Sequence, residues 1–164
     1  MELPQTRDLL EKLAEAIRAE ISGPVFMVGI HTGGAWLARA LHDMLHLNTP
    51  LGTLDISFYR DDFERIGLHP EVKPSDIPFD VDAADILLVD DVLYTGRTVR
   101  AAINELFDYG RPSRIRLAVL VDRGGRELPI EAGFKGIRID PGENRMIDLL
   151  KNEKGELQLR LRPE

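Results

Sequence analysis

The pattern of apolar and polar positions divides the chain into segments of two kinds. Residues 5–21 place apolar side chains at helical spacing, and Thr6 stands where it could cap that helix. Apolar runs typical of buried strands occupy residues 25–30, 86–89 and 114–121. Helical patterns follow the first two runs, at residues 35–45 and 99–107. Strands that alternate with helices predict an α/β fold with a mostly parallel central sheet flanked by helices.

The middle and the end of the chain follow a different pattern. Residues 51–59 are β-rich with one polar face, whereas residues 60–80 contain several prolines and little periodicity. Long aperiodic segments in a small domain are usually lids or disordered, so we expect a flexible loop at 60–80. Short strands are expected at residues 134–139, 145–150 and 156–161, and Lys154 and Gly155 form a hairpin turn between the last two.

Four unusual loops follow expected strands. They lie at residues 31–34, 60–62, 90–98 and 122–129. In parallel sheets ligands bind at the carboxyl ends of the strands, so we expect these loops to converge on one site.

The segment at residues 86–98 carries the most chemical information. Its apolar run leads to two adjacent carboxylates, Asp90 and Asp91, and residues 95–98 then open a helix. A helix N-terminus with small residues favours an anion, while paired carboxylates accept hydrogen bonds from a sugar diol or face Mg²⁺. A phosphate at one end and a hydroxyl-rich ring at the other describe a ribose 5-phosphate. The alternative is an ordinary turn in which the acids are solvated and a Thr caps the helix.

The composition agrees with one compact domain and excludes several classes of protein. The chain has 164 residues and is 43% hydrophobic, which is enough for a sizeable core. It has no Cys, so disulfides and thiolate metal sites are excluded, and this fits a cytoplasmic protein. No apolar run is long enough to span a bilayer, and the first residues do not resemble a signal peptide. The net charge of −7 disfavours indiscriminate binding to nucleic acids.

Residues 86–98 resemble the signature for phosphoribosyl pyrophosphate (PRPP) of the type I phosphoribosyltransferases. Together with three further segments, they resemble the PyrR family of pyrimidine-operon attenuators that are also uracil phosphoribosyltransferases. The four segments lie at residues 28–34, 54–62, 89–101 and 120–130. The resemblance implies a type I phosphoribosyltransferase fold in a single domain over residues 1–164. The flexible loop would be residues 60–80, and residues 122–164 would form a small hood and the C-terminal strands.

The resemblance also implies a reaction and a set of partners. Uracil and PRPP would give UMP and pyrophosphate, with Mg²⁺ as the cofactor. The protein would be a cytoplasmic homodimer or higher homo-oligomer with no membrane attachment. Binding of a leader mRNA hairpin, in response to UMP or UTP, would be a second role.

Carried over by position, the resemblance assigns the site residues in four groups. The catalytic group would comprise Asp90, Asp91, Tyr59 and Arg60, with the two acids near the ribose and Mg²⁺, directly or indirectly. The 5′-phosphate group would comprise Tyr94, Thr95, Gly96, Arg97 and Thr98. The pyrophosphate group would comprise Thr32, Gly33 and Gly34, and the base group Val92, Asp122, Arg123, Gly124 and Gly125.

Two of these assignments have a physical basis and a plain alternative. Backbone N–H groups of residues 32–34 could hold the charge of departing pyrophosphate, or the glycines could serve a tight turn only. Tyr59 and Arg60 could close over the reacting centre and exclude water, or Arg60 could be a solvated surface residue.

The choice of base and the RNA role depend on a few positions. Tyr94 stands where purine phosphoribosyltransferases have an Asp that works on the base nitrogen, so we expect a pyrimidine base. RNA-binding family members carry Thr-Arg-Gly, Arg-Gly-His-Arg and Lys-Asn where this chain has Gly33, Gly125 and Ile137–Arg138. Cations dominate RNA affinity, so these changes predict weak RNA binding. Three hypotheses remain: a uracil phosphoribosyltransferase, an RNA-binding attenuator, and a non-catalytic nucleotide sensor.

Overall fold

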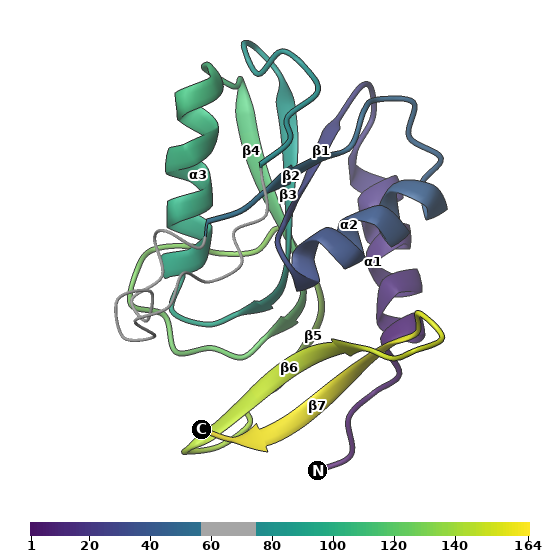
Figure 1. Ribbon diagram of the computed structural model, residues 1–164, viewed down its shortest axis with the longest axis vertical. Helices are drawn as coiled ribbons and strands as arrows, with labels where there is room; N and C mark the ends of the chain where they lie inside the picture. Colours follow the sequence, from purple (N-terminus) through teal and green to yellow (C-terminus); the bar gives the residue numbers. More distant parts are fainter. Residues whose placement is uncertain (57–74) are drawn as a thin grey trace.

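The computed structural model of the chain describes residues 1–56 and 75–164 (Figure 1). The helices are α1 (Thr6–Glu20), α2 (Gly33–Met44) and α3 (Arg97–Tyr109). The strands are β1 (Phe26–Ile30), β2 (Gly52–Leu54), β3 (Asp85–Leu93), β4 (Arg114–Asp122), β5 (Phe134–Arg138), β6 (Arg145–Lys151) and β7 (Leu157–Pro163). None of the described helices combines the length and the apolar character needed to cross a membrane. The predictions for Tyr59, Arg60 and most of the 60–80 loop lie outside the described residues.

The described strands form two sheets. β2, β1, β3, β4 and β5 lie side by side in that order, and every neighbouring pair is parallel. β6 and β7 form a separate antiparallel pair near the carboxyl ends of the central strands (Figure 1). The parallel central sheet with flanking helices confirms the predicted fold class.

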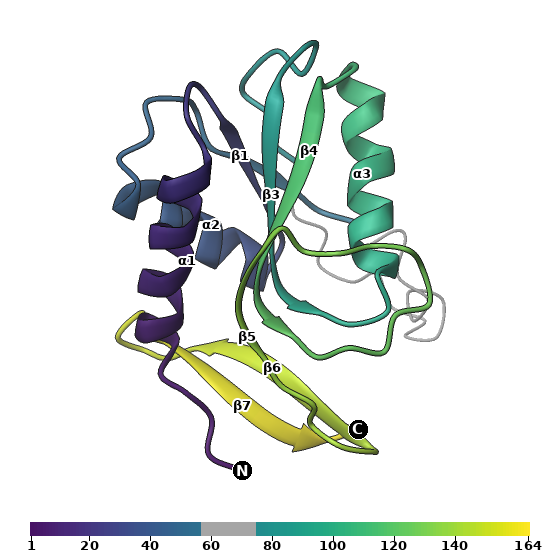
Figure 2. The same cartoon turned by 180° about the vertical axis from the view of Figure 1, so that it is seen from behind.

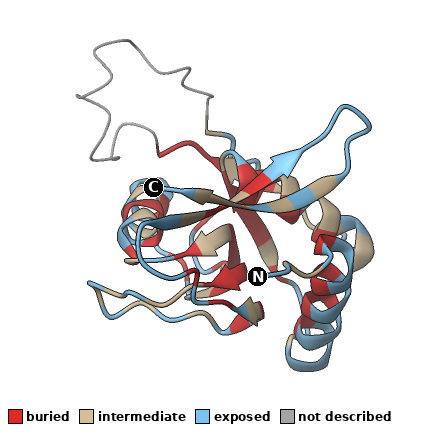
Figure 3. Cartoon of the chain, turned by 90° about the horizontal axis from the view of Figure 1, so that it is seen from below, coloured by how far each residue is buried: buried red, intermediate tan, exposed pale blue. Residues whose placement is uncertain are grey.

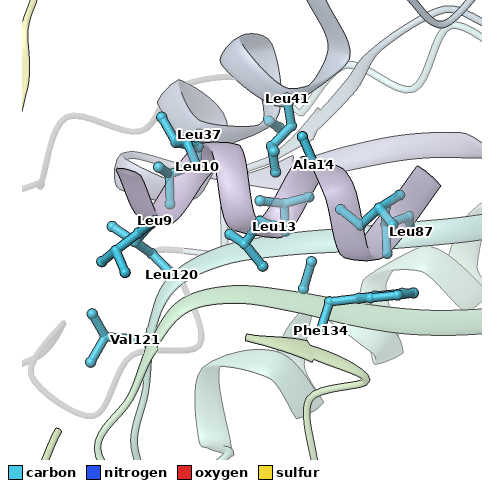
Figure 4. Close-up of a cluster of buried hydrophobic side chains, with 14 of the residues drawn as sticks. Leu9, Leu10, Leu13, Ala14, Leu37, Leu41, Leu87, Leu120, Val121 and Phe134 are labelled. Carbon is cyan, nitrogen blue, oxygen red and sulfur yellow. The ribbon is translucent and has the colours of Figure 1, made fainter. Parts of the chain in front are cut away.

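Helices cover both faces of the central sheet (Figures 1 and 2). On one face α2 packs over β1 and β3 and α1 packs over β4 and β5, and Leu13, Leu37 and Leu87 belong to one buried apolar cluster (Figure 4). On the other face α3 contributes Leu106 to a second cluster, which includes Leu88. Successive residues of β3 thus alternate between two cores, as expected for a strand buried on both faces. The loops at the strand ends are therefore carried by a rigid framework.

The β6–β7 hairpin lies across the end of the molecule where the central strands finish, and we call it the hood (Figures 1 and 3). Ile147 and Leu149 of β6 are buried and join the apolar cluster that contains α1. Lys151, at the end of β6, places its Nζ 5.7 Å from the centre of the Trp36 ring on α2. The hood is therefore anchored to both helices on that face of the sheet.

Most predicted elements are confirmed to within a few residues, but three details were wrong. Gln5 occupies the N-cap position of α1, while Thr6 is already helical and buried. β3 continues through the acidic pair to Leu93 instead of ending at residue 89, because backbone pairing with β4 is indifferent to side-chain polarity. Only Gly52–Leu54 forms a strand in the described part of the β-rich segment 51–59.

Candidate active site

β3 carries the acidic pair to the end of the sheet. Asp90 is only 6% exposed, and its Oδ1 accepts a hydrogen bond of 2.9 Å from the backbone N–H of Asp91. Asp91 Oδ1 in turn accepts a hydrogen bond of 2.7 Å from the N–H of Val92. Each carboxylate is therefore oriented by the amide that follows it, which fixes both before any ligand arrives.

The start of α2 lies directly against this pair. A Cβ atom on Gly33 would overlap Asp91 Oδ2, and a Cβ atom on Gly34 would lie 2.5 Å from the carbonyl oxygen of Val89. Only residues without a side chain allow the helix to approach β3 this closely. The N-terminus of α2, with its positive dipole end, is thereby brought next to the acidic pair.

A short loop connects β3 to α3. Gly96 adopts a φ of +95° and is buried, with Ile130 so close that an added Cβ would lie 3.1 Å from it. Thr95 Oγ1 accepts a hydrogen bond of 3.1 Å from the N–H of Arg97, whose Nε forms a 3.2 Å ion pair with Glu127. The open N-terminus of α3 therefore stands at the same end of the sheet as the acids, where it favours an anion.

The loop after β4 packs on the loop after β3 through Arg123 and Tyr94. The guanidinium carbon of Arg123 lies 3.9 Å from the centre of the Tyr94 ring, a cation–π contact. Arg123 Nη1 also donates a 3.1 Å hydrogen bond to the carbonyl of Arg145, at the start of the hood. Gly125 has a φ of +79°, and a Cβ there would lie 2.5 Å from the Tyr94 ring. Arg123 therefore links both loops to the hood.

Asp122 is buried at the end of β4, with 2% exposure. Its Oδ1 accepts a 2.9 Å hydrogen bond from the N–H of Gly124, and its Oδ2 a 2.7 Å hydrogen bond from Arg126 Nη2. Burial alone would raise the pKa of this carboxyl, but these hydrogen bonds and the charges of Arg126 and Lys135 outweigh it and lower the pKa. Asp122 is therefore held as a carboxylate whose bonds stabilise the loop.

These loops and the hood surround a cavity of about 800 Å³. Its wall contains five residues of the predicted site: Asp91, Val92, Thr95, Arg97 and Thr98. A smaller cavity, of about 210 Å³, is lined by Asp90, Val92, Leu93, Tyr94, Thr95, Gly96, Thr98, Val99, Arg123, Met146 and Ile147. The two cavities share several residues, so the acidic pair and the start of α3 face one connected region.

Other predicted residues lie close by without lining these two cavities. Gly33 and Gly34 pack on the acidic pair, and Gly124 and Gly125 belong to the loop that carries Arg123. Thr32 precedes α2 and is exposed. Asp122 lines neither cavity, since its carboxylate is turned to Gly124 and Arg126.

The contribution of the hood to the site was not predicted from the sequence. Strand β6 of the hood lines the larger cavity with Met146, Ile147, Asp148, Leu149 and Leu150. The other lining residues that were not predicted are Ile56, Glu127 and Glu164. Asp148 is held by hydrogen bonds from Arg160 and Arg162, which overcome the effect of burial and lower the pKa of its carboxyl. The strand itself was predicted, but no local pattern indicates which distant loop a hairpin will face.

Comparison with known proteins agrees with this geometry. The family model for the phosphoribosyl transferase domain matches residues 2–156. The chain is 50% identical over 155 residues to the "Bifunctional protein PyrR" of Pseudomonas paraeruginosa, covering 92% of this chain and 91% of the relative. It is 52% identical over 145 residues to the protein of the same name from Nitrosococcus oceani, covering 87% and 82% of the two chains.

A solved structure of similar fold is a hypoxanthine-guanine phosphoribosyltransferase from Bacillus anthracis. Its TM-score is 0.67 at 19% identity, and the match covers 85% of this chain and 84% of that one. At this identity the likeness concerns the fold, which is that of a type I phosphoribosyltransferase. The family match over most of the chain and the identity to curated relatives lead to one conclusion: the chain belongs to the PyrR family of phosphoribosyltransferases.

Proposed function

We propose that the chain transfers the phosphoribosyl group of PRPP to uracil, giving UMP and pyrophosphate. The observation that carries this proposal is the acidic pair Asp90–Asp91 at the end of β3. Gly33 of α2 packs against Asp91 of this pair, and the N-terminus of α3 follows the pair in the chain. Two helix N-termini that flank two fixed carboxylates suit a ligand with phosphate at both ends and a diol between them.

In this proposal each part of PRPP meets a different element. The N-terminus of α3, with Thr95 and Thr98, binds the 5′-phosphate, and Asp90 and Asp91 accept hydrogen bonds from the ribose hydroxyls. Backbone N–H groups at the start of α2, beside Thr32, bind the pyrophosphate. The base lies against Val92, Arg123 and the hood, which together border the two cavities.

The reaction follows from these contacts. Uracil N1 attacks the anomeric carbon, the bond from that carbon to the pyrophosphate oxygen breaks, and the electron pair leaves with pyrophosphate. The proton on N1 passes to water. Positive charge that develops on the sugar is stabilised by the acidic pair, and negative charge on the leaving group by the α2 N-terminus. Tyr59 and Arg60, which lie outside the described residues, are proposed to exclude water.

The donor set of the site fits Mg²⁺ as a partner of the substrate. Among the described residues, no cluster of three or more side chains could enclose a metal ion. Two carboxylates are present, Asp90 and Asp91, and Mg²⁺ is commonly held by one or two carboxylates, substrate phosphates and water. When bound, Mg²⁺ supplies positive charge to the pyrophosphate, and we propose that the acidic pair holds it directly or through water or ribose hydroxyls.

The assembly and the extent of the domain are proposed on the same family basis. We propose that residues 1–164 form one phosphoribosyltransferase domain. The protein is expected to form a homodimer or a higher homo-oligomer.

A base screen tests the proposed function. We expect pyrophosphate release from PRPP and Mg²⁺ with uracil, and none above background with hypoxanthine or guanine, because Tyr94 replaces the carboxylate of purine enzymes. The measurement is initial rate against base concentration with a coupled pyrophosphate assay.

Equal or faster turnover of a purine would overturn the choice of base. PRPP or UMP binding without turnover of any base would favour the non-catalytic nucleotide sensor instead. The assay includes a reaction without base as its control, so that simple hydrolysis of PRPP is subtracted.

The relatives are named bifunctional, which favours testing a second function, and leader-RNA binding is the candidate. We expect this binding to be weak and sensitive to salt. At three positions where RNA-binding family members carry hydrogen-bond donors or cations, this chain has Gly33, Gly125 and Ile137. Arg126 is only 17% exposed and is engaged in internal hydrogen bonds. Loss of three charge-assisted contacts of about 1.5–3 kcal/mol each would carry a tight complex to the micromolar range or weaker.

The test is a fluorescence titration of a pyrimidine-operon leader hairpin and of a scrambled hairpin at fixed ionic strength. The expected result is a similar weak affinity for both, which falls steeply as salt is added. Nanomolar affinity for the leader alone, strengthened by UMP, would instead restore the attenuator role. Lys135, Arg138 and Arg145, all exposed, are the residues that would then supply the cations.

A further inference from the structure

Arg126 joins three segments: the end of β4, the loop that follows β4, and the loop between β3 and α3. Its Nη2 donates a 2.7 Å hydrogen bond to Asp122 at the end of β4, and its Nε a 2.7 Å hydrogen bond to the carbonyl of Ile130. Its Nη1 donates a 2.9 Å hydrogen bond to the carbonyl of Tyr94, in the loop between β3 and α3. All three nitrogens of the guanidinium are therefore used.

The carbonyl of Thr95 is held by the loop that carries Arg126. Thr95 accepts hydrogen bonds of 2.9 and 3.2 Å from the backbone N–H groups of Glu127 and Leu128. The carbonyls of Tyr94 and Thr95 are thus both fixed by residues 126–128. These two residues lead directly into the N-terminus of α3, the proposed site of the 5′-phosphate.

We propose that Arg126 is a positioning residue, which sets the loop at residues 94–96 in the conformation that binds the 5′-phosphate of PRPP. The inference rests on the proposed function and extends it to a residue that lines neither of the two cavities. The planar guanidinium of Arg126 donates hydrogen bonds to Asp122, Tyr94 and Ile130 at once. The ammonium group of a Lys at the same place cannot reach all three acceptors with the same geometry.

The test compares Arg126→Lys with the wild-type protein. Lys keeps the positive charge beside Asp122 but loses the guanidinium hydrogen bonds to Tyr94 and Ile130. We therefore expect the Kd for PRPP with Mg²⁺, measured by calorimetry, to rise on the order of 10- to 100-fold. The KM for PRPP should rise in parallel, while kcat at saturating PRPP changes much less. Glu131→Gln is the matched control. Glu131 is 73% exposed and forms a 3.4 Å ion pair with the same guanidinium, so its loss should leave the Kd unchanged.

The outcomes separate a positioning role from a purely structural one. Arg126→Lys with a lowered melting temperature but a wild-type Kd and KM for PRPP would overturn the proposal. If this variant does not fold, the double variant Asp122→Asn with Arg126→Gln leaves no buried charge unpaired, and it should fold and show the same weakened PRPP binding. A double variant that folds and binds PRPP normally would also overturn it. Failure of the proposed function is distinct, since the wild-type protein would then show neither PRPP binding nor turnover.

Discussion

Replacing Asp90 or Asp91 by Asn should lower kcat/KM for uracil and PRPP on the order of 100- to 1000-fold. Each change removes one negative charge from the ribose region while keeping the shape of the side chain. Asn retains an oxygen that can accept the hydrogen bond now made by the following amide, so the local backbone should persist. The measurement is steady-state pyrophosphate release, with circular dichroism to verify the fold.

Asp108→Asn is the matched control for these variants. Asp108 is exposed near the end of α3, far along the helix from its N-terminus, and its replacement should leave kcat/KM unchanged. Near-normal kcat/KM in both Asp90→Asn and Asp91→Asn would show that the negative charges of the pair do not contribute to catalysis. The ribose assignment would then be abandoned.

The second large effect is expected for Gly34→Ala. The added Cβ would lie 2.5 Å from the carbonyl oxygen of Val89 and 3.0 Å from the Cα of Asp90, both backbone atoms that cannot move aside cheaply. We expect a loss of about 1–3 kcal/mol in the free energy of unfolding, because overpacking must shift α2 away from β3. Activity of the folded fraction should fall as well, since the same shift separates the α2 N-terminus from the acidic pair. Urea denaturation and kcat/KM at a matched folded fraction measure the two effects.

Gly133→Ala provides the comparison for this substitution. A Cβ on Gly133 would meet only the carbonyl oxygen of Leu117, at an ordinary contact distance of 3.7 Å. Its stability and activity should therefore remain close to wild type. If Gly34→Ala behaved like Gly133→Ala, the tight contact between α2 and β3 would have no role in fixing the site.

Much of the fold could be predicted from the sequence because its signals are local. The short apolar run before Asp90 has the length of a buried strand, and the amphipathic pattern after Thr98 has the period of a helix. Once the strands are parallel, the loops that follow them must gather at one edge of the sheet. This is why Thr98, after β3, and Glu127, in the loop after β4, line the same cavity.

The features of the site that could not be predicted from the sequence depend on contacts between distant segments. The assignment of Asp122 to the base group stays a prediction, but the hydrogen bonds of its carboxylate to Gly124 and Arg126 could not be predicted, because charge alone does not reveal that pairing. The wall that β6 adds to the larger cavity depends on where the hood packs, which is decided by buried residues such as Ile147 on a distant core. Thr6, predicted as the N-cap, is instead the first residue of α1 and is buried.

The contact between Lys151 and Trp36 gives the protein a natural optical reporter. Trp36 is the single tryptophan of the chain, and it lies on α2 in the first turns after the proposed pyrophosphate loop. Because a cation near an indole ring alters its emission, the intrinsic fluorescence of Trp36 is expected to change when Lys151 of the hood moves toward or away from the ring. Stopped-flow fluorescence of the unlabelled protein therefore tests whether substrate binding changes the distance between Lys151 and Trp36.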